Sequence, residues 1–224
     1  MNSRRFSRAA LYVATISLIF ASFAHAGPPL ICHAIEIGQA KSLPWVDLNY
    51  HRASTDYNLQ NLTRDTIAAL DSDATVLVHM ETLRRATLYA RQAPQTAKEL
   101  LTRLDARAVN SEAPNAALAW FDAGYLAEAY KQWFGKDEAN PARGLDGYAW
   151  VTKAIQLRGS DPEMEFAAAL ITLTVAPQDR AAHVQKALAG ANSDPLLARN
   201  LACDFRHQTI SALLSRDASQ PLSQ

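Results

Sequence analysis

The sequence has few of the residues on which common enzyme and metal sites depend. Only two cysteines occur, Cys32 and Cys203, and neither a C-x-x-C pair nor an H-E-x-x-H motif is present. The chain also lacks the G-x-x-x-x-G-K-[S/T] phosphate loop and the G-x-S-x-G nucleophile motif. We therefore expect no catalytic residue, no metal and no cofactor, and a non-enzymatic function.

Glycine is scarce as well, and runs of alternating β-branched residues are nearly absent. The 224 residues include 8 glycines, most of which stand between apolar segments, whereas alanine and leucine are abundant. Strict alternation of apolar and polar residues is the pattern of a half-buried strand. Its scarcity argues against a sheet and predicts an all-α fold.

Only one long uncharged apolar run occurs, over residues 9–24. Three arginines precede this run, and Ala24-His25-Ala26 follows it as a small-x-small cleavage site. That order of parts predicts a cleaved secretory signal peptide at residues 1–26. The run is shorter than the roughly 20 residues that span a bilayer, and it is followed by Gly-Pro-Pro. We expect a periplasmic or secreted protein with no membrane span after cleavage.

The predicted mature chain has no excess of positive charge. Removing residues 1–26 takes away three arginines and no acid, which leaves 19 basic and 22 acidic side chains and a net charge of −3. Nucleic-acid binding depends on clustered lysine and arginine. We expect no nucleic-acid partner.

Apolar residues at helical spacing follow one another from residue 57 to residue 215. Offsets of three and four residues recur in each segment, as on one face of a helix. The clearest stripes are Leu59, Leu62, Thr66, Ile67 and Leu70; Val76, Leu77, Met80 and Leu83; Ala97, Leu100, Leu101, Leu104 and Ala108; Leu118, Phe121, Tyr125, Ala129 and Trp133; Tyr148, Val151 and Ile155; Met164, Ala167, Ala168 and Ile171; and Ala181, Val184 and Leu188. They predict about eight antiparallel helices stacked as hairpins.

Helix-start and helix-end signals separate these stripes. Prolines stand near the start of several proposed helices, where a missing N–H costs nothing. Asp161 precedes Pro162 and Asp194 precedes Pro195, so both aspartates are placed to cap a helix N-terminus. Gly159 and Gly190 are predicted to lie just past helix ends, where a left-handed conformation is often required.

Two of these boundaries belong to an internal repeat. VTKAIQLRGSDP (151–162) matches VQKALAGANSDP (184–195) at Val, Lys, Ala, Ser, Asp and Pro, with a constant offset of 33 residues. A period in the low thirties equals one helical hairpin and is typical of a stacked helix-pair solenoid.

The same stretch resembles the tetratricopeptide repeat. KAIQLRGSDPE is similar to the end of such a repeat, with Ala154 in the second helix and Pro162 at the turn. AWFDAGY (119–125) is similar to its start, with Trp120 followed four residues later by the small Gly124. The chain departs from the family in the enlarged loop 135–147, which lengthens the first repeat. The resemblance covers residues 114–195 and implies a short α-solenoid that binds peptides or proteins.

The segment between the signal peptide and the helices has a different character. Pro28 and Pro29 predict a stiff, non-helical start to residues 27–56, and the segment contains the apolar residues Leu30, Ile31, Ile35, Ile37 and Trp45. Such an extended apolar segment is expected either to line its own groove or to contact a partner. We therefore predict an extended segment at 27–56, a helical-repeat domain at 57–215 and a disordered tail at 216–224.

The cysteines leave two structural alternatives and one chemical alternative. Cys32 and Cys203 can form a disulfide if residues 27–56 fold back along the array; otherwise Cys203 is expected to be a buried small apolar residue. The chemical alternative is a small redox or metal-dependent protein that uses Cys32 with His33 as the partner of the thiol.

The leading expectation is an exported adaptor that binds a protein or peptide. Its contact surface is expected to be the concave face of the array together with the loop 135–147. Gly124, Trp120, Ala154, Pro162 and Pro195 are assigned to helix packing. Replacing Gly124 by leucine is expected to overpack the array, whereas alanine is expected to be tolerated.

Overall fold

The computed structural model describes residues 28–32, 34–46, 53–71, 74–112, 114–136 and 139–205. Within these ranges the fold is all-α, as predicted, and the extended pairing is confined to one isolated bridge between Trp45 and Ala53. The helices are α1 (Pro29–Cys32), the 3₁₀ turn η1 (Leu59–Asn61), α2 (Leu62–Leu70), α3 (Val76–Ala90), α4 (Pro94–Asn110), α5 (Ala116–Phe134), α6 (Gly147–Arg158), α7 (Pro162–Val175), α8 (Arg180–Gly190) and α9 (Pro195–Phe205). The predicted signal peptide (1–26), His33 and the tail 216–224 lie outside the described residues.

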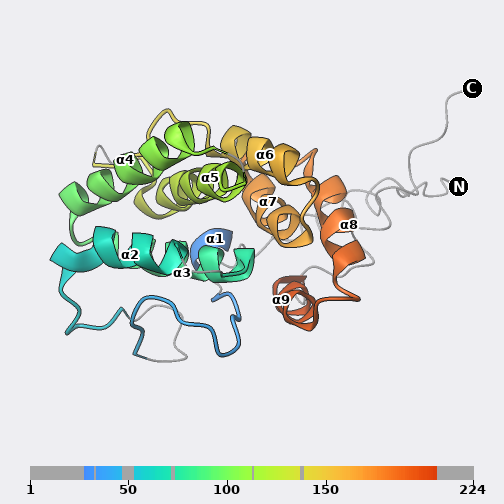
Figure 1. The fold of residues 1–224 in the computed structure, drawn as a ribbon, viewed down its shortest axis with the longest axis horizontal. Coiled ribbons are helices and arrows are strands. Elements are labelled where there is room, and N and C mark those ends of the chain that lie inside the picture. Colours follow the sequence, from blue (N-terminus) through green and yellow to red (C-terminus); the bar gives the residue numbers. More distant parts are fainter. Residues whose placement is uncertain are drawn as a thin grey trace, which may run out of the picture.

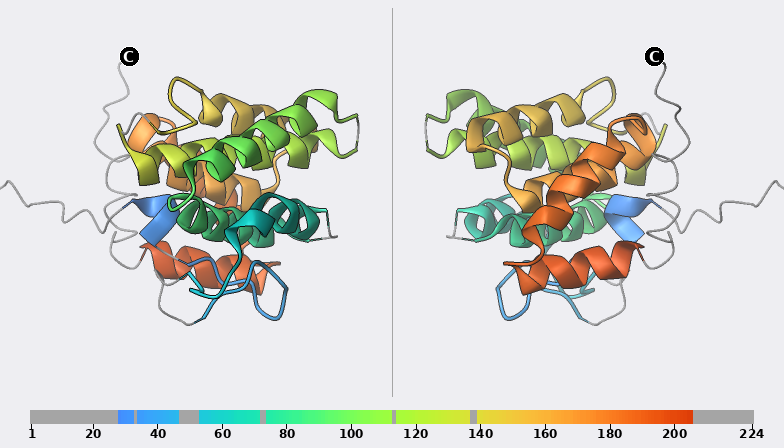
Figure 2. Two further views of the ribbon diagram at one scale, coloured as in Figure 1. Left: turned by 90° about the vertical axis from the view of Figure 1, so that its left-hand side faces the viewer. Right: turned by 90° about the vertical axis from the view of Figure 1, so that its right-hand side faces the viewer.

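The helices form two layers with α1 inside them (Figure 1). α3, α5 and α7 contact one another and make the inner layer, and α1 contacts all three. α2, α4, α6 and α8 lie outside and pack against their neighbours along the chain. α9 lies beside the N-terminal segment, on the opposite side of the molecule from α4 and α6 (Figure 2).

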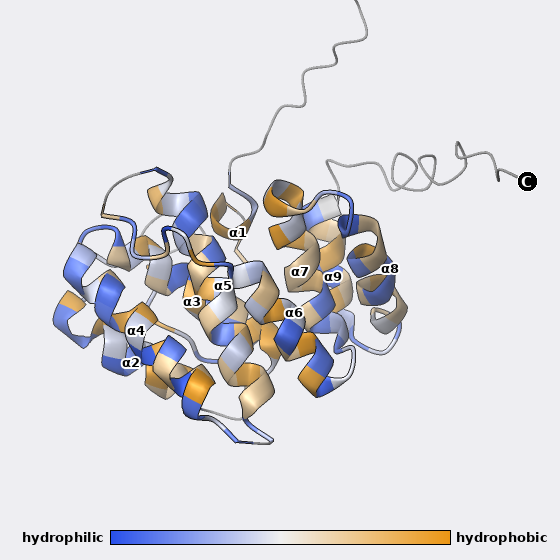
Figure 3. Cartoon of the chain, turned by 90° about the horizontal axis from the view of Figure 1, so that it is seen from above, coloured by the Kyte–Doolittle hydropathy of each residue, from blue (hydrophilic) through white to orange (hydrophobic). Residues whose placement is uncertain are grey.

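The inner helices are buried on nearly every side. In α7 the buried residues run without a break from Met164 to Thr172, and α5 is buried from Phe121 to Tyr130. A helix that is apolar around its whole circumference requires neighbours on all sides, and the ribbon of α7 is accordingly drawn mostly in hydrophobic colours in Figure 3. The outer helix α4 instead buries a single stripe: Ala97, Leu100, Leu101, Leu104 and Ala108.

Several predicted helix boundaries are confirmed. Asp161 accepts hydrogen bonds from the N–H groups of Glu163 and Met164 at the start of α7. Asp194 caps α9 in the same way, through Leu196 and Leu197. Gly159 ends α6 in the left-handed conformation, with φ of 81°. The two stretches that are 33 residues apart therefore lie at equivalent places, each ending a helix and capping the next one.

The prediction for Gly190 is wrong. This residue is the last one of α8 rather than a residue beyond it, and its φ is not positive. A Cβ at Gly190 would lie 2.3 Å from the Cβ of Pro162. The glycine is therefore required because α8 approaches the start of α7 closely, and not because of its backbone conformation.

Gly124 lies at a close contact between α5 and α6, and here the sequence prediction is half correct. A Cβ on Gly124 would lie 2.6 Å from the carbonyl oxygen of Gly147, and a Cβ on Gly147 would lie 2.5 Å from that of Gly124. α5 and α6 thus cross backbone against backbone. The packing role of Gly124 is confirmed, but the expectation that alanine is tolerated there is wrong because even one methyl group collides with main chain.

The other four residues assigned to packing occupy three different settings. Ala154 is fully buried, whereas Trp120 is half-buried and meets Trp150 edge to face. Pro162 and Pro195 are the first residues of α7 and α9.

Candidate functional site

The N-terminal segment docks onto the helices in two parts. We call α1 (Pro29–Cys32) the anchor and residues 34–46 the strap. In the anchor, Leu30 and Ile31 are completely buried among the inner helices. The strap buries only Ile35, Ile37 and Leu43, and residues 38–41 are exposed. Of the two alternatives that the sequence left open for this segment, the described residues take the first and pack against the helices of their own chain. Its non-helical start is wrong, since Pro29 begins one helical turn, a position where proline is well tolerated.

Three charged residues of α3 form a rigid group beneath the strap. Glu81 is fully buried and accepts hydrogen bonds from Arg84 (Nε to Oε2, 2.7 Å; Nη2 to Oε1, 2.9 Å). Arg85 donates from Nε to Oε1 of the same glutamate over 2.7 Å. These charges are mutually satisfied, which is the condition under which buried ions are tolerated, and their side chains are fixed relative to α3.

The first half of the strap is bound through its main chain. The N–H of Ile35 donates to Oε2 of Glu81 over 3.0 Å. Asn200 of α9 accepts from the N–H of Glu36 over 2.8 Å and donates back to the carbonyl oxygen of Glu36 over 2.9 Å. A carboxamide that pairs with both the N–H and the C=O of one residue recognises extended backbone whatever the side chain is.

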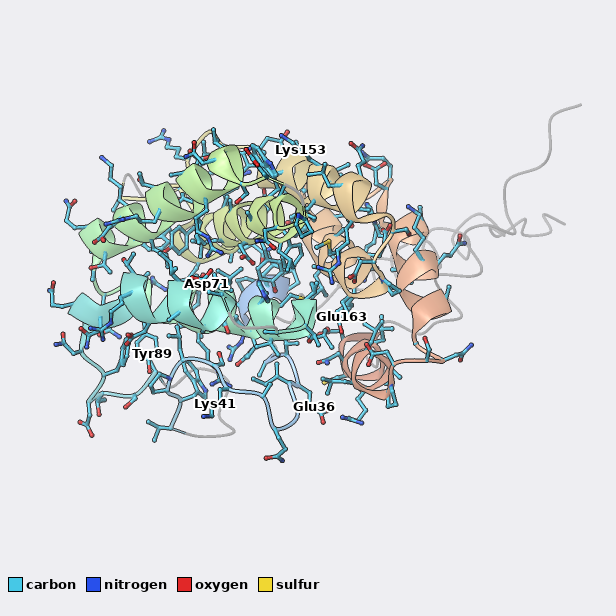
Figure 4. All side chains as sticks on the ribbon, viewed as in Figure 1. Glu36, Lys41, Asp71, Tyr89, Lys153 and Glu163 are labelled. Carbon is cyan, nitrogen blue, oxygen red and sulfur yellow. The ribbon has the colours of Figure 1, made fainter. Side chains whose placement is uncertain are left out.

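The second half of the strap is bound in the same manner. Nη1 of Arg85 donates to the carbonyl oxygen of Leu43 over 2.7 Å, and the hydroxyl of Tyr89 donates to that of Pro44 over 2.6 Å. The Tyr89 oxygen also accepts from the N–H of Ser54. Figure 4 shows Tyr89 on the side of α3 that faces the strap, with Glu36 and Lys41 on the outer edge of the molecule. We call these four side chains, Glu81, Arg85, Tyr89 and Asn200, the strap-binding face, together with Thr82, whose hydroxyl bonds to that of Ser42 over 2.9 Å.

Near the end of the strap, Trp45 packs against two arginines and a tyrosine of α3. Its ring lies 5.2 Å from the guanidinium carbon of Arg84 and 5.6 Å from that of Arg85, and it meets Tyr89 edge to face. The ring of Tyr57 also packs against the ring of Tyr89, with the ring centroids 4.6 Å apart. Cation–π contacts of this kind add to the attraction for an aromatic residue at this position.

In the first half of the strap, one side chain, that of Glu36, is also bound by a charged residue of the helices. Glu36 is half-exposed and accepts from Nε of Arg199 over 2.8 Å. Arg199 therefore places a positive charge beside position 36, whereas Arg84 and Arg85 both pair with Glu81. The surroundings therefore favour an acidic residue at position 36.

The cysteines are free and lie in different settings. Cys32 is half-buried in the anchor, and burial raises the pKa of its thiol above the usual value by more than nearby Arg84 lowers it. Cys203 is exposed, so the expectation that it is buried is wrong: α9 turns Leu197, Asn200 and Leu201 inward and leaves Cys203 on the other face. The structure does not join the two cysteines.

Two buried histidines, His79 and His183, are held by carboxylates. Nδ1 of His79 lies 2.6 Å from Oδ1 of Asp122, and burial raises the pKa of the Asp122 carboxyl. His183 lies between Glu165, at 2.5 Å from Nδ1, and the hydroxyl of Tyr148, at 2.8 Å from Nε2. Both groups connect different helices, and neither lines a cavity that the structure describes.

A cavity of about 380 Å³ lies where the N-termini of α3, α7 and α9 meet. Asp161 and Asp194 line it, but both cap their own helices, and Asp161 also pairs with Arg158. Glu163 is also engaged within the protein, because its Oε2 accepts a hydrogen bond from the N–H of Leu77 and so caps α3. Burial, with the nearby aspartates adding to it, raises the pKa of Glu163 to about 7. The cavity is thus a junction of helix caps.

The described part of the loop 135–147 is held by hydrogen bonds within the loop and by a cap on α6. Asn140 is buried, donates to the carbonyl oxygen of Gly135 and accepts from the N–H of Ala142. Asp146 ends the loop by capping α6 through Ala149.

Among the described residues no group of three or more histidine, cysteine or acidic side chains is placed to hold a metal ion. The described helices also include none that is long and apolar enough to cross a membrane. Comparison with known proteins gives no match to any family model, curated protein or solved structure.

The residues that make the strap-binding face were not predicted from the sequence. Glu81, Arg84 and Arg85 are charged residues within a helix and have the composition of a solvated surface. The feature of the sequence that could have indicated them is the apolar N-terminal segment. An apolar segment that lies on a helix needs partners for its main-chain N–H and C=O groups.

Proposed function

We propose that this chain is an exported, non-enzymatic helical-repeat protein that acts as a protein- or peptide-binding adaptor. The observation that carries the proposal is the main-chain recognition of the strap. The strap-binding face contacts Ile35, Glu36, Leu43 and Pro44 through their backbone atoms, so it suits an extended peptide of varied sequence.

The binding site in this proposal differs from the one that the sequence suggested. The inner surface of the array is filled by the anchor, whose two large side chains are fully buried. The strap-binding face, which is formed by α3 and α9, is therefore the surface assigned to peptide binding. Export to the periplasm or beyond is part of the proposal and rests on the signal-like residues 1–26.

Peptide selection tests the proposal. A random library of extended peptides is panned against the chain without residues 1–26, and affinities are measured by fluorescence anisotropy. We expect to find peptides whose affinity falls at least tenfold with Asn200→Asp, which removes the Nδ2 donor that bonds to the carbonyl oxygen of Glu36 in the strap. Their affinity should not change with Gln156→Ala, on the exposed face of α6. If no peptide binds better than it binds an unrelated helical protein, the proposal fails.

The alternative, a redox or metal-dependent protein that uses Cys32 and His33, has less support. A reactive thiol needs a lowered pKa, whereas the pKa of Cys32 is raised by burial. Titration of free thiols and metal analysis of the purified protein separate the two proposals, because the alternative requires one reactive thiol and bound metal.

A further inference from the structure

We infer that the strap is an internal competitor for the strap-binding face, and that the partner is an extended peptide with an acidic residue between two apolar residues. This inference rests on the proposed function and specifies its ligand.

The first step of the argument is the pattern of the strap itself. Ile35 and Ile37 are buried and Glu36 between them points outward to Arg199, which is the alternation of an extended chain on a surface. Asn200 fixes the chain at the middle residue by bonding to both its N–H and its C=O. Any peptide with the same alternation presents the same main-chain atoms.

The second step is charge. Arg199 is about half-exposed and pairs with Glu36. An acidic residue at the middle position is therefore attracted, and a basic one is repelled.

The third step separates the strap from the anchor. Leu30 and Ile31 are completely buried and are joined to the inner helices through Gln132 and Arg84. The strap has an exposed stretch at residues 38–41 and contacts the face on either side of it. A peptide can therefore replace residues 34–37 while the anchor remains in the core.

The fourth step is the tether. Because the strap belongs to the same chain, it competes at an effective concentration that an untethered peptide must exceed. Weakening the strap should therefore raise the affinity for an added peptide without any change in the face.

The experiment uses the full chain without residues 1–26 and a labelled synthetic peptide that carries residues 34–46. The variant is Ile35→Ser with Ile37→Ser, which weakens the strap alone. We expect the variant to bind the peptide at least tenfold more tightly than the wild type does. A peptide with Glu36→Lys should bind the variant at least fivefold more weakly, and Arg199→Glu in the protein should reverse that preference.

A second variant guards against misfolding of the first. Inserting about thirty Gly and Ser residues on each side of the strap, after Cys32 and after Val46, leaves the face and the strap unchanged and lowers the effective concentration of the strap by roughly tenfold. Peptide affinity should rise by a similar factor.

Two outcomes overturn the inference. If both variants are folded by circular dichroism and bind the peptide no better than the wild type does, the strap is a permanent part of the core. If library-selected peptides bind wild type and both variants equally, the strap is not their competitor; the adaptor proposal then survives at another surface while this inference fails.

Discussion

The contact between α5 and α6 and the contact between the strap and α3 with α9 are built in opposite ways. At the first, Gly124 and Gly147 bring main chain against main chain, and a Cβ on either would lie within 2.6 Å of a carbonyl oxygen. At the second, long polar side chains of the helices contact the main chain of another segment. The contact between α5 and α6 is compatible with only one arrangement of atoms. The contact with the strap is compatible with any extended chain that has suitable apolar residues.

The difference assigns separate roles to the two regions. A contact that excludes a single methyl group specifies the fold, because no alternative packing satisfies it. A contact that depends on backbone hydrogen bonds is not specific to one sequence, and it is therefore suited to recognition. Substitutions at the helix crossing should cost stability, and substitutions at the strap should change both stability and peptide binding.

The largest effect is expected at the helix crossing. Gly124→Leu should destabilise the protein by at least about 3 kcal/mol or prevent folding, and Gly124→Ala should cost about 1–3 kcal/mol because its Cβ collides with backbone. Urea denaturation measures both. Gln156→Ala, on the exposed face of α6, is the control and should stay within about 0.5 kcal/mol of the wild type. A Gly124→Ala variant as stable as the wild type would mean that α5 and α6 are farther apart than described.

The anchor should rank next. Ile31→Ala removes a fully buried side chain and should lower the free energy of unfolding by about 2–5 kcal/mol. Val46→Ala, at the exposed end of the strap, should change it by less than about 0.5 kcal/mol. Thermal and urea unfolding test the pair. Equal, small losses at both positions would contradict the docking of the anchor in the core.

A pH effect is expected where α3, α7 and α9 meet. The pKa of Glu163 is raised from 4.5 to about 7, so between these values the folded protein binds more protons than the unfolded chain does. The free energy of unfolding should then fall as pH rises from about 4.5 to 7. Asp204, whose pKa is also raised by burial to about 7, adds to the same trend.

Glu163→Gln isolates the first of these groups. The variant should be more stable than the wild type at pH 8 and nearly equal to it at pH 4, with a shallower dependence of the unfolding midpoint on pH. Glu99→Gln on the exposed face of α4 should leave the dependence unchanged. If Glu163→Gln is the less stable protein at pH 8, the carboxylate is ionised without penalty and its burial is not as described.

The smallest effect on stability is expected at the strap's outward residue. Arg199→Ala breaks a pair in which both side chains are 53% exposed, so unfolding should change by at most about 1 kcal/mol. Arg103→Ala, an exposed arginine of α4, is the matched control and should have no effect. A loss of several kcal/mol with Arg199→Ala would place this arginine in the core of the contact instead of at its rim.

Much of the helical body could be predicted because its signals are local. The stripe from Ala97 to Ala108 is the buried face of α4, and Asp161 and Asp194 cap the helices that their prolines begin. Such features depend on residues a few positions apart. The apolar residues of the N-terminal segment indicated that it is buried, but they left open whether it packs on its own helices or on a partner.

What could not be predicted depends on which helices meet. Glu81 and Asn200 bind the strap from α3 and α9, which are more than a hundred residues apart in sequence, and a charged or amide side chain carries no local sign of that role. The crossing at Gly124 has the same origin, because the collision that excludes alanine comes from Gly147 on the next helix. Cys203 was misplaced since the orientation of α9 is set by its contact with the strap.

Hydrogen exchange of the Ile35 and Glu36 amides tests most directly whether the strap is a bound but separable peptide. These N–H groups are held by Glu81 and Asn200. We predict that they exchange at least a hundredfold more slowly than the amides of the exposed residues 38, 39 and 41, yet faster than the amides of α5, because the strap opens without global unfolding. Asn200→Ala, which removes the acceptor of the Glu36 N–H, should accelerate exchange of the Glu36 amide most. Exchange at the rate of an unfolded chain would show that the strap is not docked, and exchange as slow as that of α5 would show that it never separates from the core.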